Sequence, residues 1–157
     1  MPSVEYTRAK GLVQKSSTDA TLKLQGELHG NRHSLETISG DKTLTSDDSN
    51  KVFLMADADI TVNLPAAAVA GTKFRFIAAV DIDNNAVEIV QEAGAEDFQG
   101  ILLDGAGGVV AQDLAAHSLV RFVAGTAVAG DFVECVSTGS KWNIKAAGRA
   151  AGGIIFA

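Results

Sequence analysis

Apolar residues after Thr37 recur at alternate positions in short segments, and turn residues separate these segments. Residues 60–64 alternate and end at Pro65, which has no N–H to donate to a strand ladder. Residues 51–55 are apolar on both sides, and we predict that the two segments form a strand pair ending at Pro65. Further strands are predicted at 100–103 and 108–111, which flank a turn at 104–107, and at 119–123.

The same alternation predicts a hairpin around a turn at residues 84–85. Both turn residues are Asn, which tolerates the positive φ that tight hairpin turns require. Pairing about this turn sets Ile82 opposite Val87 and Val80 opposite Ile89. All four side chains then share one apolar face.

A second hairpin is predicted around 138–139, and it contains the only Cys and the only Trp of the chain. Its ladder sets Cys135 opposite Trp142 and Val133 opposite Ile144, so that one face is wholly apolar. A reactive Cys needs a base or a cation that stabilises its thiolate, and this face offers neither. We therefore predict that Cys135 and Trp142 are packed core residues.

Many short strands with turn signals at regular intervals predict an all-β fold, an antiparallel β-sandwich or barrel. Only residues 65–69 and 113–117 suggest short helical turns. No internal repeat of fixed period is present, which argues against a solenoid or a propeller. With 157 residues, 46% of them apolar, the chain is long enough for one domain with a substantial core.

The two ends of the chain differ from this pattern. Residues 1–36 carry five Lys/Arg and four Asp/Glu, a net charge of +1, whereas residues 37–157 carry eight and fifteen, a net charge of −7. The first region lacks a sustained apolar period, and we interpret it as an extended N-terminal arm with an edge strand at 20–28. The β domain, 37–157, ends in an apolar tail at 152–157. This tail must be covered by its own core or by another subunit.

Charge and cysteine content exclude several classes of protein. The net charge of −6 and the absence of clustered basic residues argue against nucleic-acid binding. A single Cys excludes an intrachain disulfide and favours folding in a reducing cytoplasm. Neither a secretory signal nor a membrane-spanning segment is recognisable, so we expect a soluble protein or part of a soluble assembly.

One candidate metal motif has the spacing of a calcium-binding EF-hand loop. It comprises Asp81, Asp83 and Asn85, with Glu92 at the twelfth position, but Ala86 replaces the glycine expected at the sixth. The flanking segments also predict strands, whereas an EF-hand loop lies between helices. A solvated turn without calcium is the favoured interpretation.

Other candidate sites are incomplete. His29 and His33, with Glu27 nearby, could share a metal only on a helix, which Gly30 and Asn31 oppose. The glycines at 105–108 lack the Lys and Ser/Thr of a phosphate-binding loop, and His117 has no evident carboxylate partner. We therefore assign no catalytic, cofactor-binding or metal-binding residue, and we expect a protein that is not an enzyme.

The succession of strands at 42–45, 47–54, 60–65 and 71–76, followed by the closing hairpin at 130–134 with Trp142, resembles small structural proteins of tailed bacteriophages. The resemblance is to head decoration (cement) proteins and to the β domains of fibres and spikes. It implies a virion protein, made in the host cytoplasm, that binds the outer capsid surface, stabilises the shell and forms a trimer.

This resemblance implies the major capsid protein as partner, with no nucleic acid, membrane or small-molecule substrate involved. In this interpretation the β domain trimerises, and the arm adds to a neighbouring subunit or to the shell. The alternative is a tail-fibre, spike or head-fibre domain that binds a host receptor.

Overall fold

The computed structural model describes residues 33–57, 59–67, 69–91, 98–107 and 117–157, together with the strands Ser3–Thr7, Gly11–Lys15 and Val109–Val110. The chain forms two compact units, Met1–Arg32 and His33–Ala157. In the first, β1 (Ser3–Thr7) and β2 (Gly11–Lys15) pair antiparallel, so the region predicted as an extended arm contains a two-stranded sheet. The predicted edge strand at 20–28 lies outside the described residues.

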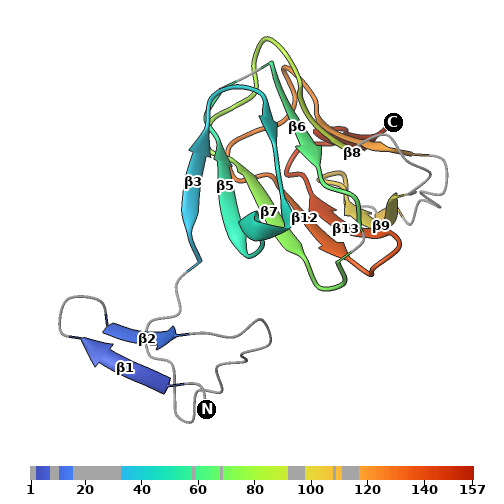
Figure 1. The fold of residues 1–157 in the computed structure, drawn as a ribbon. Helices are drawn as coiled ribbons and strands as arrows, with labels where there is room; N and C mark the ends of the chain where they lie inside the picture. The colour runs from blue at the N-terminus through green and yellow to red at the C-terminus, as the bar shows by residue number, and fades with distance from the viewer. Residues whose placement is uncertain are drawn as a thin grey trace. The chain divides into compact units, whose positions relative to one another are not determined.

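The second unit, which we call the body, is an all-β sandwich of two sheets, as Figure 1 shows. One sheet has seven strands in the order β10-β9-β13-β12-β7-β5-β3, and the other has five in the order β14-β11-β8-β6-β4. The strands are β3 (Leu35–Ile38), β4 (Lys42–Thr43), β5 (Lys51–Met55), β6 (Ile60–Leu64), β7 (Lys73–Ala78), β8 (Val87–Gln91), β9 (Phe98–Leu103), β10 (Val109–Val110), β11 (Leu119–Phe122), β12 (Phe132–Ser137), β13 (Trp142–Ala147) and β14 (Ile154–Phe156). A short 3₁₀ turn, η1 (Ser46–Asp48), precedes β5.

The body begins at His33 rather than at the predicted Thr37. The reason is β3, whose first residues pair with β5 in parallel, with Leu35 beside Val52. Glu36, which the sequence interpretation assigned to the arm, is therefore part of the seven-stranded sheet.

The first six strands of the body cross from one sheet to the other at each step. Strands β3, β5 and β7 lie side by side and parallel in the seven-stranded sheet, and β4, β6 and β8 do the same in the five-stranded sheet. The chain therefore returns to the same sheet after every second strand, which we call one turn of the winding. Such a turn takes 17 residues from Leu35 to its partner Val52, and 23 from Lys51 to its partner Phe74. Because the turns differ in length, the sequence has no fixed period that would reveal them.

Two predicted strand pairings are wrong. Strands β5 and β6 belong to different sheets, and so do β7 and β8, which were expected to form the hairpin around residues 84–85. The crossover between β7 and β8 buries Ile82, whose N–H donates to the Ala127 carbonyl at 3.0 Å and whose carbonyl accepts from the Gly125 N–H at 2.6 Å. An alternating strand buries one face whether it pairs with its neighbour in sequence or crosses to the opposite sheet, so alternation cannot distinguish the two.

The remaining strands add antiparallel partners to this winding. In the seven-stranded sheet, β12 pairs with β7 and β13 pairs with β12. In the five-stranded sheet, β11 pairs with β8 and β14 pairs with β11. The exception is β9, which lies parallel to β13. The sheets are therefore mixed, rather than antiparallel throughout as predicted. The predicted pairing of β9 with β10 and the strand β11 are both confirmed.

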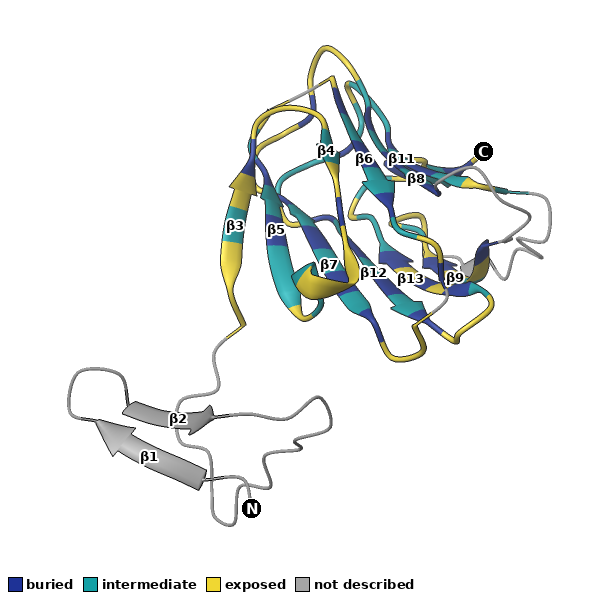
Figure 2. Cartoon of the chain, viewed as in Figure 1, coloured by how far each residue is buried: buried dark blue, intermediate teal, exposed yellow. Residues whose placement is uncertain are grey.

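The hairpin of β12 and β13 forms as predicted, but its register differs by two residues. Cys135 pairs with Ile144, and Trp142 pairs with Ser137, because the loop spans residues 138–141 and is closed by the Thr138 N–H on the Lys141 carbonyl at 2.9 Å. A shift of two residues keeps every side chain on its face. The predicted buried face is accordingly confirmed, as the alternating colours of β12 and β13 in Figure 2 show.

Aromatic side chains fill the space between the sheets. The rings of Phe53 and Phe76 stack at 5.4 Å, and Phe74 contacts Trp142 at 5.6 Å. The apolar tail also belongs to this core, since β14 pairs with β11 and buries Ile154. The sequence left open whether the tail is covered by its own core or by another subunit, and the structure shows that its own core covers it.

The described residues of the loop after β6 are not helical, contrary to the short helical turn predicted at 65–69. It is held instead by the β12–β13 hairpin: the indole N–H of Trp142 donates to the Pro65 carbonyl at 3.2 Å, and the Ser137 hydroxyl donates to the Ala67 carbonyl at 2.7 Å. These bonds satisfy two carbonyls that no strand ladder reaches. Most of the other predicted turn, at 113–117, lies outside the described residues.

Candidate functional site

The outer face of the seven-stranded sheet carries a row of mostly apolar side chains, which we call the apolar row. The strand registers place one residue from each of six adjacent strands in this row: Thr37, Leu54, Ile77, Phe132, Ala147 and Leu103. Leu103 is 37% exposed, and its neighbour Ile101 on the same face is 41% exposed. On the five-stranded sheet, the corresponding outer row holds Thr61, Glu88, Arg121 and Ile155, and Val90 pairs with Leu119 on the same face.

A charged row lies directly beside the apolar row. Arg75 on β7, Glu134 on β12 and Lys145 on β13 are cross-strand neighbours. The Arg75 guanidinium lies over the Phe132 ring, 4.8 Å from its centroid, so this cation connects the two rows. The strands position these side chains outward because the alternate residues, Phe74 and Phe76, are drawn into the core.

A shallow hollow, open to solvent, lies at one end of this face. It is lined by His33, Asn50, Lys51, Val52, Lys73, Arg75 and Glu134, and we call it the cationic hollow. The turn before β5 shapes its wall: Asn50 adopts a left-handed φ of 66°, which Asn tolerates, and its N–H donates to the Lys73 carbonyl at 2.7 Å. The His33 ring donates from Nδ1 to the Asn50 carbonyl at 3.0 Å.

One carboxylate in the cationic hollow is shared between two cations. Glu134 Oε1 lies 3.6 Å from Lys73 Nζ and 3.8 Å from Arg75 Nη1. Both distances are longer than a hydrogen bond, so neither cation has a close carboxylate partner among the residues that the structure describes. The Arg75 Nε is buried and has no acceptor among the described residues.

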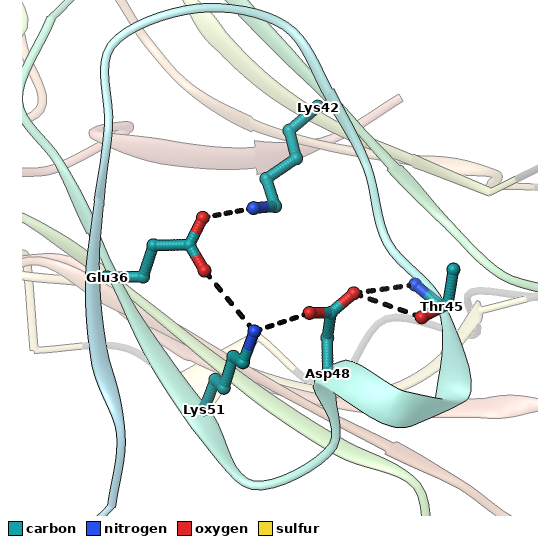
Figure 3. A network of polar contacts seen from close by, with 5 residues as sticks. All are labelled: Glu36, Lys42, Thr45, Asp48 and Lys51. Atoms are coloured by element: carbon teal, nitrogen blue, oxygen red, sulfur yellow. Dashed lines mark hydrogen bonds and ion pairs between the residues drawn. The ribbon is translucent and has the colours of Figure 1, made fainter.

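Lys51, which also lines the hollow, belongs to a separate polar network shown in Figure 3. Its ammonium lies 2.6 Å from Asp48 Oδ1 and 3.4 Å from Glu36 Oε2, and Lys42 binds the other oxygen of Glu36. The hydrogen bond from Lys42 lowers the pKa of Glu36, and that from Lys51 lowers the pKa of Asp48. The network ties β3, β4 and β5 together at the edge of the sandwich.

Those candidate residues that the structure describes do not assemble into a reactive site. Cys135 is fully buried. Desolvation raises the pKa of its thiol, and the negative charge of the nearby Glu134 raises it further, as the smaller of the two causes. The carboxylate of Asp81 accepts the Ala129 N–H at 2.8 Å, and the strands β7 and β8 flank its loop where an EF-hand would have helices. Glu92 lies outside the described residues.

The proposed histidine pair cannot be assessed as a pair, because His29 and Glu27 lie outside the described residues, while His33 lies in the cationic hollow. Within the part of the chain that is described, no three His, Cys, Asp or Glu side chains gather as metal ligands would. Gly105 and Gly107 lie in the predicted turn after Asp104, and Gly108 lies outside the described residues.

Sequence reasoning missed Asp131, which organises the loops near the C-terminus. It is fully buried, and its carboxylate accepts the Arg149 N–H at 2.8 Å and the Val128 N–H at 3.1 Å. The only local signal is the Gly-Asp pair before a strand, which is typical of any turn. The sequence interpretation also missed the cationic hollow, because the residues that line it are far apart in the chain, from His33 to Glu134.

No helix among the described residues is long and apolar enough to cross a membrane. The sequence matches no protein-family model, and no curated protein has significant similarity to it.

Proposed function

We propose that this chain is a non-enzymatic capsid decoration (cement) protein of a tailed bacteriophage, which binds the outer capsid surface as a trimer and stabilises the shell. The observation that carries the proposal is the apolar row on the outer face of the seven-stranded sheet. The inner faces of both sheets and the C-terminal tail already complete one core. An additional apolar row outside that core favours a surface that binds another protein.

The two-unit organisation supports the same proposal. The N-terminal unit, Met1–Arg32, continues directly into β3, which is the edge strand of the seven-stranded sheet. The Ser34 carbonyl accepts a hydrogen bond from the Val52 N–H, and the Ile38 carbonyl accepts one from the Ala56 N–H. Backbone groups of alternate residues in a strand point to opposite sides, so those of Leu35 and Thr37 point away from β5. Leu35 is 63% exposed. Such an edge accepts an added strand from a neighbouring molecule.

Copy number in purified particles is the direct test of this function. A decoration protein is present in proportion to the capsid subunits, because it occupies equivalent positions over the shell. A fibre or receptor-binding domain is present in a few copies and separates with the tail or the vertices. Recovery with the tail fraction would overturn the proposal, and light scattering of the purified protein tests the trimer.

The apolar row is tested by Leu103→Asp, which adds a charge to the proposed interface at an exposed position. We expect capsid binding to fall by at least about tenfold, because a carboxylate is costly to bury in an apolar contact. Val69→Asp is the matched control, since Val69 is an exposed apolar residue of the β6–β7 loop outside the apolar row. Equal binding by both variants would contradict the role of the row.

A further inference from the structure

We propose that the cationic hollow binds a carboxylate on an acidic segment of the partner protein, with Arg75 and Lys73 as the binding groups. The inference rests on the proposed function, because it identifies the chemistry of the partner at the same outer face. It is carried by four observations on the described residues: the hollow, the two cations, their single shared carboxylate and the orientation of the guanidinium.

The guanidinium of Arg75 is held in place but is short of acceptors. Its carbon lies 4.8 Å from the centre of the Phe132 ring, and its Nη1 lies 3.8 Å from Glu134. Arginine carries five N–H donors in a planar fork that fits a carboxylate through two parallel hydrogen bonds. A guanidinium fixed by an aromatic ring loses less conformational entropy when it binds such a group.

The charges that face the hollow leave an excess of positive charge. Lys51 is already matched by Asp48 and Glu36, at 2.6 Å and 3.4 Å. Among the described residues, Lys73 and Arg75 share Glu134 as their one carboxylate. In a chain with a net charge of −6, a concave site with surplus cations favours an anionic partner group.

The position of the hollow favours a protein as the source of this carboxylate. Phe132, which supports Arg75, is itself a member of the apolar row, so the charged and apolar contacts form one continuous surface. Protein interfaces combine an apolar centre with a charged rim in this way. A partner segment with an apolar side chain beside an Asp or Glu would satisfy both parts.

The binding chemistry is tested on the full chain with an acetylated tetraglutamate peptide as probe and tetraglutamine as its neutral counterpart. We expect the glutamate peptide to shift the Arg75 Nε–H resonance and the amides of β5 and β7. Arg75→Gln and Lys73→Gln should each weaken binding by about fivefold to tenfold. Lys145→Gln, on the same face but outside the hollow, should leave binding unchanged.

Equal shifts with tetraglutamine, or unchanged binding in both hollow variants, would overturn the inference. Glucuronate is the probe for a sugar carboxylate, and tighter binding of glucuronate than of the peptide would overturn the assignment to a protein segment. Arg75→Lys, which keeps the charge but removes the fork, should restore part of the loss. Thermal unfolding of each variant shows whether a loss of binding reflects a loss of fold.

Capsid binding by the same variants separates this inference from the proposed function. Weaker capsid binding by Arg75→Gln and Lys73→Gln supports it. If the wild type binds capsids and both variants bind equally well, the hollow has no role in docking and the inference fails, while decoration stands. If no form binds capsids but the peptide still binds the hollow, decoration fails and the carboxylate site is supported. If the variants dissociate an oligomer of the wild type, the carboxylate belongs to a second copy, which contradicts a separate partner.

Discussion

The thiol of Cys135 lies between the two sheets, fully buried on the inner face of β12. Burial raises the pKa of this thiol, so at neutral pH it is protonated as well as inaccessible. We predict that a chromogenic thiol reagent leaves native Cys135 unmodified and labels it only on the timescale of unfolding. Rapid labelling of the native protein, compared with complete labelling in denaturant, would contradict the packed position.

Gly100 on β9 lies where no side chain fits. Its φ is +149°, and a Cβ atom at this position would lie 1.7 Å from the carbonyl oxygen of Ile144 on the neighbouring β13. We predict that Gly100→Ala destabilises the body by at least about 2 kcal/mol, because backbone must move to admit the methyl group. Gly40→Ala is the matched control, since nothing lies within 4 Å of a Cβ there. Denaturant unfolding of the two variants measures the difference.

At the scale of elements, the polar network of Glu36, Asp48, Lys42 and Lys51 joins β3 to β4 and β5. Hydrogen bonds from the lysines lower the pKa values of Glu36 and Asp48 in the folded state below 4.5 and 3.8, their ordinary values. A carboxyl group whose folded pKa is lowered contributes stability that is fully present above its unfolded pKa and is lost as the pH falls through its folded pKa.

We therefore predict that the free energy of unfolding decreases as the pH is lowered below about 4.5, in part through this network. Glu36→Gln should reduce that dependence while leaving the remaining slope intact. The effect should also shrink at high salt, because both carboxylates are partly exposed and their ion pairs are screened. An identical pH profile in Glu36→Gln would show that the network contributes no stability.

The strands themselves were more predictable than their partners. Val133, Cys135 and Ile144 alternate with polar residues, and this local pattern places them on the buried face whichever register forms. The partner of β7 is not a local property. It pairs with β5 and β12 because those strands complete a common buried layer around Phe74 and Phe76, whereas β8 completes the opposite layer.

At the scale of the whole molecule, the body contains its own complete core. The buried apolar side chains from Ile38 to Phe156 form one cluster between the two sheets. We predict that a chain lacking residues 1–32 still folds, with a thermal midpoint within a few degrees of the full chain and an unchanged β-sheet circular dichroism spectrum. Loss of cooperative unfolding in this truncated chain would show that the N-terminal unit contributes to the stability of the body.

The all-β class, the position of most strands and the burial of Cys135 and Trp142 followed from the residues alone, because a period of two decides locally which side chains face a core. Only the tertiary structure decided which sheet each strand joins, that β5 and β7 run parallel, and that His33, Lys73, Arg75 and Glu134 surround one hollow. These features depend on contacts between segments far apart in the chain. Such contacts are selected by the shared burial of both sheets, which no single segment encodes.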